Sequence, residues 1–331
     1  MKRRDTDYLY STTRIRAMEK NLLNAERIGR MLDAKSFEDT VRIPAEMGYG
    51  EITEPSQKSI EHALAKERDD TIKTILSFVD ECGIVDIIRL KYDYHNIKTL
   101  IKAEHMPEEA DILSGAGHIP FDVIKTSMRE SDFGDFDPIM RGGIIEAREV
   151  LSRTNDPQLS DFVLDRAYFA ELLKSAGETK SGFIGGYVRL LIDVYNLRAW
   201  VRATRQKKNI EFIKNALISG GDTDVSRLLS AGAERGGINE IYSGTRLSEA
   251  AAAGERAASG ETGFLDFERL CDNALIEYIK SAKYVAFGEA PIAAYLIAKE
   301  ADITNIRIIL AGKLEGLSAD EIRARLRGQY V

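Results

Sequence analysis

The chain has 331 residues, of which 46 are Lys or Arg and 53 are Asp or Glu, so its formal net charge is −7 at pH 7. A chain of this length can bury a substantial core in one large domain or in two to three smaller ones. The acidic balance disfavours a general nucleic-acid binder, which normally has a basic face. Two cysteines are too few for a disulfide framework and fit a reducing compartment.

The chain begins with the charged residues MKRR, and no apolar segment follows them, so we expect no secretory signal. Seven prolines and abundant Ala, Leu, Ile, Glu, Lys and Arg favour helix. Ile72, Ile75, Leu76 and Val79 have the spacing of an amphipathic helix, and long alternating runs typical of strands are missing. We therefore predict an all-α fold.

Clusters of Gly and polar residues predict loops at 47–56, 131–138, 232–240 and 253–263. Between these loops we predict three helical repeats with the boundaries 5–128, 138–232 and 236–331. The most apolar region, 290–310, is interrupted by Lys299, Glu300, Asp302 and Arg307, so we expect no membrane span.

One helical motif occurs once in each predicted repeat. It reads DYHNIKTL at 93–100, DVYNLRAW at 193–200 and DITNIRII at 302–309. At ~100° per residue, the positions −2, +1, +4 and +5 from the asparagine form one apolar arc. The arcs consist of Tyr94, Ile97, Leu100 and Ile101; Val194, Leu197, Trp200 and Val201; and Ile303, Ile306, Ile309 and Leu310. The triplication predicts three pseudo-threefold helical subdomains.

Each motif also carries an Asp and an Asn on or beside its apolar arc. The pairs are Asp93 and Asn96, Asp193 and Asn196, and Asp302 and Asn305. Buried polar side chains must find hydrogen-bond partners, because unpaired ones cost kilocalories. One interpretation is a structural lock that fixes how each helix packs, and this is the common use of polar groups in helical cores. The alternative is a polar ring around an axis that contacts a partner.

A Leu, a Gly and a short amphipathic segment follow each motif. We align these segments as LSGAGHIPFDVI (113–124), LISGGDTDVSRLL (217–229) and LEGLSADEIRARL (314–326). The glycine after a Leu-ended helix is typical of a C-cap, and Asp222, Thr223 or Ser318 can N-cap the helix that follows.

Residue patterns for catalysis are missing. The four histidines have no metal-ligand spacing, and HExxH and CxxC do not occur. GETKSG at 177–182 lacks the glycines of a phosphate-binding loop, and Asp132-Phe133-Gly134 stands without the other kinase motifs. We expect no catalytic residue, no cofactor and no metal site.

The whole chain resembles the C subunit of rotary A-type and V-type ATPases, whose eukaryotic counterpart is the d subunit. The resemblance covers YLYSTTRIRAMEKNLLNAERIGRMLDAKSFEDTV (8–41), the following Tyr49-Gly50, and the three asparagine helices. Its most specific part is YLIAKEADITNIRIILAGKLEGLSADEIRARL (295–326), where Asp302 replaces an expected Glu. Each motif alone is weak, but their order and spacing together are specific.

The resemblance implies a funnel-shaped, three-lobed, non-catalytic protein on the cytoplasmic face of a membrane. It would rest on the proteolipid ring, receive the tip of the central shaft and couple the two, with membrane contact only through the ring. We expect interface residues in two basic stretches, although a solvated helix face is the ordinary interpretation of such residues. The candidates are Arg202, Arg205, Lys207, Arg323, Arg325 and Arg327.

Two other functions are compatible with the sequence. One is a free-standing α-helical scaffold that binds a peptide or a helical partner in a groove, and the other is a helical hydrolase with an unrecognised site. Co-purification with a membrane sector separates the first from the rotary-complex component, and an activity screen tests the second.

Overall fold

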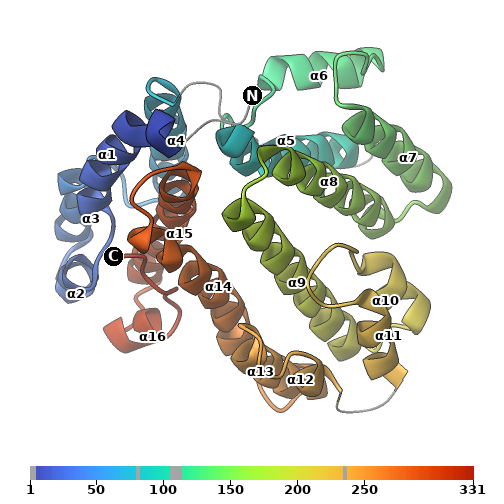
Figure 1. The fold of residues 1–331 in the computed structure, drawn as a ribbon. Helices are drawn as coiled ribbons and strands as arrows, with labels where there is room; N and C mark the ends of the chain where they lie inside the picture. Colours follow the sequence, from blue (N-terminus) through green and yellow to red (C-terminus); the bar gives the residue numbers. More distant parts are fainter. Residues whose placement is uncertain (1–4, 80–82, 105–113, 234–236) are drawn as a thin grey trace. The chain divides into compact units, whose positions relative to one another are not determined.

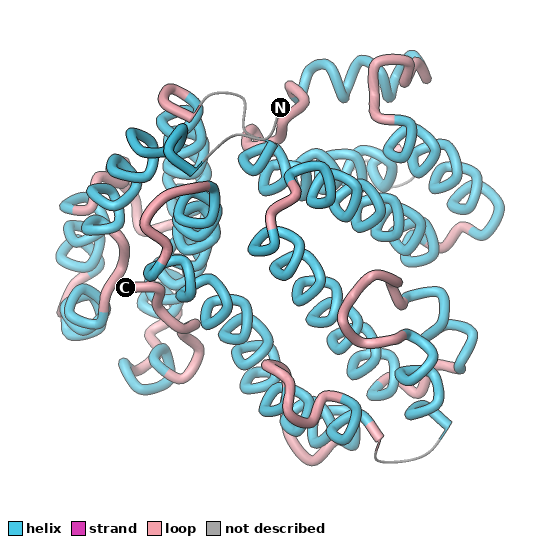
Figure 2. The backbone as a smooth tube through the Cα atoms, in the orientation of Figure 1, coloured by secondary structure: helices cyan, strands magenta, loops and turns pink. Residues whose placement is uncertain are grey.

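The computed structural model describes residues 5–79, 83–104, 114–233 and 237–331. These residues form α-helices and short 3-10 helices joined by loops, with no strand among them (Figures 1 and 2). The predicted all-α fold is confirmed. Within these ranges, no helix combines the length and apolar character that a membrane span requires.

The described chain divides into two compact units. The first takes its described residues from 1–82, 204–207 and 230–331, and the second from 83–203 and 208–229. The helices mainly in the first unit are α1 (Leu9–Met18), α2 (Ala25–Asp33), α3 (Phe37–Glu46), α4 (Gln57–Leu76), α12 (Ile238–Ile241), α13 (Ser248–Ser259), α14 (Leu265–Ile279), α15 (Glu289–Leu314) and α16 (Ala319–Arg323). The 3-10 helices η1 (Asp5–Tyr8), η2 (Glu19–Asn21) and η4 (Lys280–Tyr284) belong to it too.

The helices mainly in the second unit are α5 (Gly83–Ala103), α6 (Phe121–Glu130), α7 (Pro138–Thr154), α8 (Pro157–Thr179), α9 (Gly182–Arg205), α10 (Ile210–Ala216) and α11 (Val225–Ala233). The predicted repeat boundaries 5–128, 138–232 and 236–331 stay a prediction.

The core of the first unit forms around α15. Helices α1, α3, α4 and α14 all pack against it (Figure 1), and a helix covered on several sides is apolar on several sides. Its isoleucines at 303, 306 and 309 are fully buried in one cluster with Leu23, Met31 and residues of α4. The cluster therefore joins the two ends of the sequence in one core.

In the second unit, α7 and α8 lie side by side (Figure 1). Asn155 ends α7 in the left-handed conformation, and Asp156 caps α8, which starts with Pro157. Gly143 permits the close approach, because a Cβ there would lie 2.6 Å from the Cβ of Ala167. A short connection and a small residue thus produce a tight helical hairpin.

The structure corrects one predicted loop and part of another. Residues 253–259 are the end of α13, since the alanine-rich sequence before Gly260 favours helix strongly enough to include Gly254. Only from Gly260, with φ 93°, does the chain leave the helix. Of the predicted loop 232–240, residues 234–236 lie outside the described residues, and 238–240 belong to α12.

Candidate functional site

The three repeated motifs lie on three long helices, α5, α9 and α15. Eleven of the twelve side chains of the apolar arcs are buried, and Leu100 is half-buried. Lys98 and Arg307, each two residues after its motif asparagine, form ion pairs. Lys98 Nζ lies 2.5 Å from Asp165 Oδ1, and Arg307 Nε lies 2.7 Å from Glu61 Oε1.

Each asparagine side chain binds both backbone groups of one residue in a segment that returns to the helix. Asn96 accepts from the Ser114 N–H and donates to the Ser114 carbonyl, both at 2.9 Å. Asn196 does the same with Ile218, both at 2.7 Å. Asn305 accepts from the Arg327 N–H at 2.7 Å and donates to its carbonyl at 3.1 Å. All three asparagine side chains are buried, and each pairs both backbone groups of its partner residue.

These contacts correct the sequence alignment of the third repeat. The partner lies 218 − 196 = 22 residues after Asn196 and 327 − 305 = 22 residues after Asn305. In both repeats a short helix with a capped N-terminus lies between the asparagine and its partner residue. Asn209 caps α10 and Ser318 caps α16, each 13 residues after the motif asparagine (209 − 196 and 318 − 305). The segment that contains α16 therefore corresponds to α10, not to 217–229.

Asp93 and Asp193 accept hydrogen bonds from the loops that follow these asparagine partners. The Asp93 carboxylate accepts from the His118 and Ile119 N–H groups at 3.1 and 3.0 Å. The Asp193 carboxylate accepts from the Asp222 and Thr223 N–H groups, both at 3.1 Å. The loop passes closely over the carboxylate, because a glycine precedes each donor pair.

A side chain at either glycine would occupy the space of the carboxylate. A Cβ at Gly117 would lie 2.2 Å from Asp93 Oδ1, and a Cβ at Gly221 would lie 2.2 Å from Asp193 Oδ1. Such a distance is far below van der Waals contact. Both contacts between loop and carboxylate therefore require a glycine at this position.

Asp302 has a different donor. Its carboxylate accepts from the Leu23 N–H at 2.7 Å, and Leu23 lies between η2 and α2, 279 residues earlier in the chain. One turn before Asp302, the buried Lys299 ammonium lies 2.7 Å from Glu67 of α4. Asp302 thus connects α15 to the N-terminal segment, whereas Asn305 binds the returning segment of its own repeat.

Burial is the largest influence on the pKa of all three aspartates. It raises the pKa of Asp93 to about 6 and the pKa of Asp302 to about 7. Burial also raises the pKa of Asp193 above its usual range. The backbone N–H donors oppose this shift in each case, since they stabilise the charged form. These carboxylates are thus held in environments that disfavour their ionised form.

The first basic stretch lies at the end of α9. Arg202, Arg205 and Lys207 are exposed, and Lys207 has a left-handed backbone with φ 55°. Arg205 donates to the Ala257 carbonyl at 3.3 Å, and its guanidinium lies over Gly260. Arg205 therefore braces α13 as well as facing solvent.

The second basic stretch follows α16. Arg323 and Arg325 are exposed, whereas Arg327 is half-buried and its Nε lies 2.6 Å from Asp272 of α14. Arg327 also supplies the backbone groups that Asn305 binds. Its side chain is thus already engaged within the first unit, and Arg323 and Arg325 remain the more available candidates.

Two surface features were not found from the sequence. One is a cleft of about 580 Å³ in the second unit, lined by apolar side chains and by carboxylates of α5, α8 and the segment before α7. The other is the exposed apolar segment 284–287 before α15. In the sequence this segment is a short apolar run, YVAF, that does not follow the spacing of a helix. In the part of the chain that the structure describes, no group of His, Cys, Asp and Glu is arranged to hold a metal ion.

Comparison with known proteins gives a match over nearly the whole chain. The family model described as ATP synthase (C/AC39) subunit matches residues 11–325. The C subunit of the V-type sodium ATPase of Enterococcus hirae is 25% identical over 325 residues, which cover 96% of this chain and 97% of that protein. The C subunit of the A-type ATP synthase of Methanocaldococcus jannaschii is 24% identical and covers 96% of this chain and 86% of that protein. That of Haloferax volcanii is 28% identical over 81% of this chain and 80% of that protein.

Proposed function

The chain belongs to the ATP synthase (C/AC39) subunit family as a non-catalytic C subunit of a rotary A/V-type ATPase, and from this premise we propose that it is the socket that couples the rotating shaft to the proteolipid ring. In this role it would receive the tip of the shaft, rest on the ring at the cytoplasmic face and transmit torque between them. The observation that carries the proposal is the family match over residues 11–325 together with three buried side-chain locks.

A torque-transmitting protein must be stiff where its helices meet its loops. Each asparagine side chain is buried and fixes a returning segment to a long helix through two hydrogen bonds. Buried, fully paired polar groups specify one packing arrangement, because any slip leaves them unpaired. The locks therefore support a rigid body better than a flexible groove that adapts to peptides, and they favour the socket over a free-standing scaffold.

We propose that the two basic stretches belong to the contacts with the shaft and the ring. Contacts that assemble from separate subunits and then resist torque combine apolar anchors with complementary charges. In the first stretch these would be Arg202, Arg205 and Lys207. In the second, the side chains of Arg323 and Arg325 point to solvent, and Arg327 braces the segment from within.

Charge reversal in a reconstituted complex tests this assignment. The Arg323→Glu/Arg325→Glu double variant is expected to lower ion transport per ATP hydrolysed at least several-fold, because like charges at an interface repel. Hydrolysis by the catalytic head is expected to continue. Lys207→Glu is the corresponding test of the first stretch, and it leaves the Arg205 brace to Ala257 in place.

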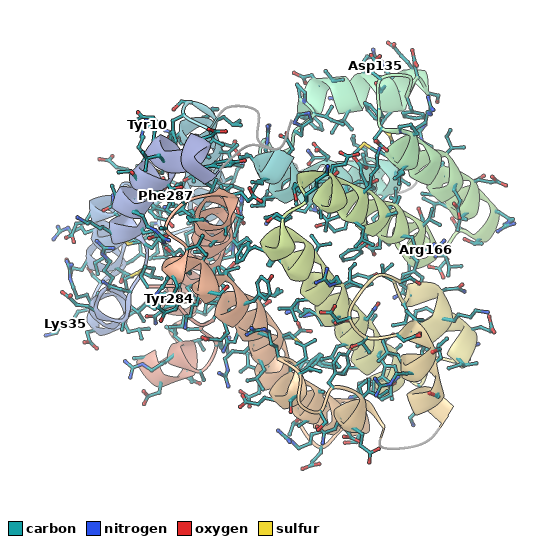
Figure 3. All side chains as sticks on the ribbon, viewed as in Figure 1. Tyr10, Lys35, Asp135, Arg166, Tyr284 and Phe287 are labelled. Carbon is teal, nitrogen blue, oxygen red and sulfur yellow. The ribbon has the colours of Figure 1, made fainter. Side chains whose placement is uncertain are left out.

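Lys35→Glu is a matched control, since Lys35 is another solvent-facing cation, between α2 and α3 (Figure 3). Unchanged coupling in both reversal variants would exclude these stretches as interface. Hydrolysis of ATP by the purified chain alone would contradict the proposed function itself.

A further inference from the structure

The segment between η4 and α15 exposes four consecutive apolar residues, 284–287, which we name the apolar loop. Tyr284 is 92% exposed, Phe287 is 41% exposed and Val285 is 36% exposed. Ala286 is exposed as well. Single exposed apolar side chains are ordinary, but a run of four that includes two aromatic rings has the character of an interaction surface.

The apolar loop is held in place from both ends by α1. The Arg16 guanidinium donates to the Ala282 carbonyl at 2.7 Å and to the Val285 carbonyl at 2.8 Å. The Thr12 hydroxyl donates to the Gly288 carbonyl at 3.4 Å. Arg16 is itself oriented by Glu19, at 2.8 Å. A loop fixed in this way loses little conformational entropy when a partner binds it.

Lys283 borders the apolar loop and has no carboxylate within ion-pair distance among the described residues. Lys283, directly before the loop, lies over the Tyr330 ring at 4.9 Å. Lys283 is exposed, so a negative charge on a partner would complement it.

Building on the socket function, we propose that the apolar loop is the anchor for a neighbouring protein of the rotary complex, one that offers an apolar pocket edged by carboxylates. Exposed Tyr and Phe side chains on a rigid support are typical interface hot spots. Figure 3 labels Tyr284 and Phe287 on the segment that leads into α15. The aromatic rings would fill the pocket, and Lys283 would face the carboxylates at its edge.

The local charge pattern favours a protein pocket over a lipid surface. Glu277 pairs with Lys280 at 2.5 Å, and Glu289 stands at the start of α15. The segment 277–289 therefore has two cations and two anions, Lys280 and Lys283 against Glu277 and Glu289. An anionic bilayer attracts summed positive charge at ~1 kcal/mol per cation, and the sum here is close to zero. A shaped pocket can instead match individual charges.

The test measures binding of the full chain to two assemblies from the same organism. One is the membrane sector from which this protein has been removed, and the other is the catalytic head with its shaft. The Tyr284→Ser/Phe287→Ser double variant is expected to bind the assembly that carries the pocket about thirtyfold more weakly than the unaltered chain does. Lys283→Glu is expected to weaken the same binding by about threefold to tenfold.

The matched control is Phe264→Ser/Leu265→Ser, which changes two other exposed apolar residues, 37% and 46% exposed, at the start of α14. Its binding is expected to stay within about threefold of the unaltered chain, and thermal melts of both double variants check folding. Unchanged binding of the Tyr284→Ser/Phe287→Ser variant overturns the assignment of the apolar loop and leaves the socket function intact.

A second experiment measures binding of the chain to vesicles of phosphatidylcholine and phosphatidylglycerol. No binding of the unaltered chain to these vesicles is expected. Vesicle binding that the Tyr284→Ser/Phe287→Ser variant loses would overturn the protein partner in favour of a membrane. An unaltered chain that binds neither assembly would contradict the socket function and the anchor together.

Discussion

The motifs on α5 and α9 and the motif on α15 contain the same residues but find their partners in different places. On α5 and α9, each aspartate accepts two N–H groups from a glycine-containing loop 25 to 30 residues later. On α15, Asp302 accepts one N–H from Leu23. The asparagine contact is the same in all three. The motif therefore specifies the acceptor, while the topology of the chain decides which segment donates.

This difference has a physical reason. A buried carboxylate requires donors, but any backbone N–H with suitable geometry satisfies it equally well. In the first unit the N-terminal segment packs on α15 and supplies the donor, so the end of the chain is tied to its beginning.

The largest expected effect is on the shared asparagine contact. Asn196→Leu and Asn305→Leu should each lower the free energy of unfolding by about 2–4 kcal/mol, because two buried backbone groups lose their partners. Urea denaturation of each variant measures the loss. The comparison predicts similar values on α9 and α15, and a loss below ~0.5 kcal/mol in either variant would mean that the contact is not a lock.

The next largest effect is expected where a glycine-containing loop passes over the aspartate, which occurs only at the motifs on α5 and α9. Gly221→Ala should cost about 1–3 kcal/mol, since the added methyl meets the Asp193 carboxylate at 2.2 Å. Gly142→Ala is the control, because Gly142 is exposed inside α7 with nothing within 4 Å of the added methyl. The control should be neutral or stabilising. Equal stability of both variants would contradict the close passage of the loop.

Protonation of Asp302 should make the free energy of unfolding depend on pH. Its pKa of about 7 in the folded chain lies above its usual value of 3.8, so the folded state binds the proton more tightly than the unfolded chain. The contribution of Asp302 to the free energy of unfolding is therefore fully present below pH ~4 and is lost as pH rises through about 7. Asp302→Asn removes this dependence and keeps an oxygen that can accept from Leu23.

The measurement is the stability of Asp302→Asn relative to the unaltered chain, by thermal melts from pH 5 to pH 8. The variant should gain on the order of 1–3 kcal/mol over this range. Other titrating groups are common to both proteins and cancel in the difference. A difference that stays constant with pH would show that the Asp302 carboxylate is not held in a medium that disfavours its charge.

The smallest effects are expected from the ion pairs beside the motifs. Lys98→Met should cost ~1 kcal/mol, and Arg307→Met ~0.5 kcal/mol, because partly exposed pairs contribute little. The Lys98 pair is the better buried of the two. Double-mutant cycles with Asp165→Asn and Glu61→Gln isolate each pair. A larger coupling for Arg307 than for Lys98 would reverse this order.

Helical periodicity was enough to predict the all-α fold, because the apolar arcs repeat with the period of the helix. The same periodicity put the asparagines and aspartates beside the core, where the structure has them. Local propensity misjudged residues 253–259, where alanines outweigh a single glycine. These features depend on side chains near one another in the sequence.

The partners of the locks could not be predicted in this way. Leu23, Ser114, Ile218 and Arg327 contribute backbone groups, which are the same for every residue and leave no sequence signature. The third repeat was misaligned for that reason, since its Leu-Gly pattern resembled 217–229 although the contact of Asn305 lies at Arg327. The apolar loop was missed because exposure of a short apolar run is a property of packing.

The socket that we propose couples the shaft to the ring without taking part in hydrolysis. The most direct measurement is ATP-driven ion transport and ATP hydrolysis by the rotary complex prepared without this protein, before and after the purified chain is added back. We expect ATP hydrolysis in both preparations and ion transport only after the chain is added back. Transport at full rate in its absence, or hydrolysis that depends on it in the detached catalytic head, would contradict the account.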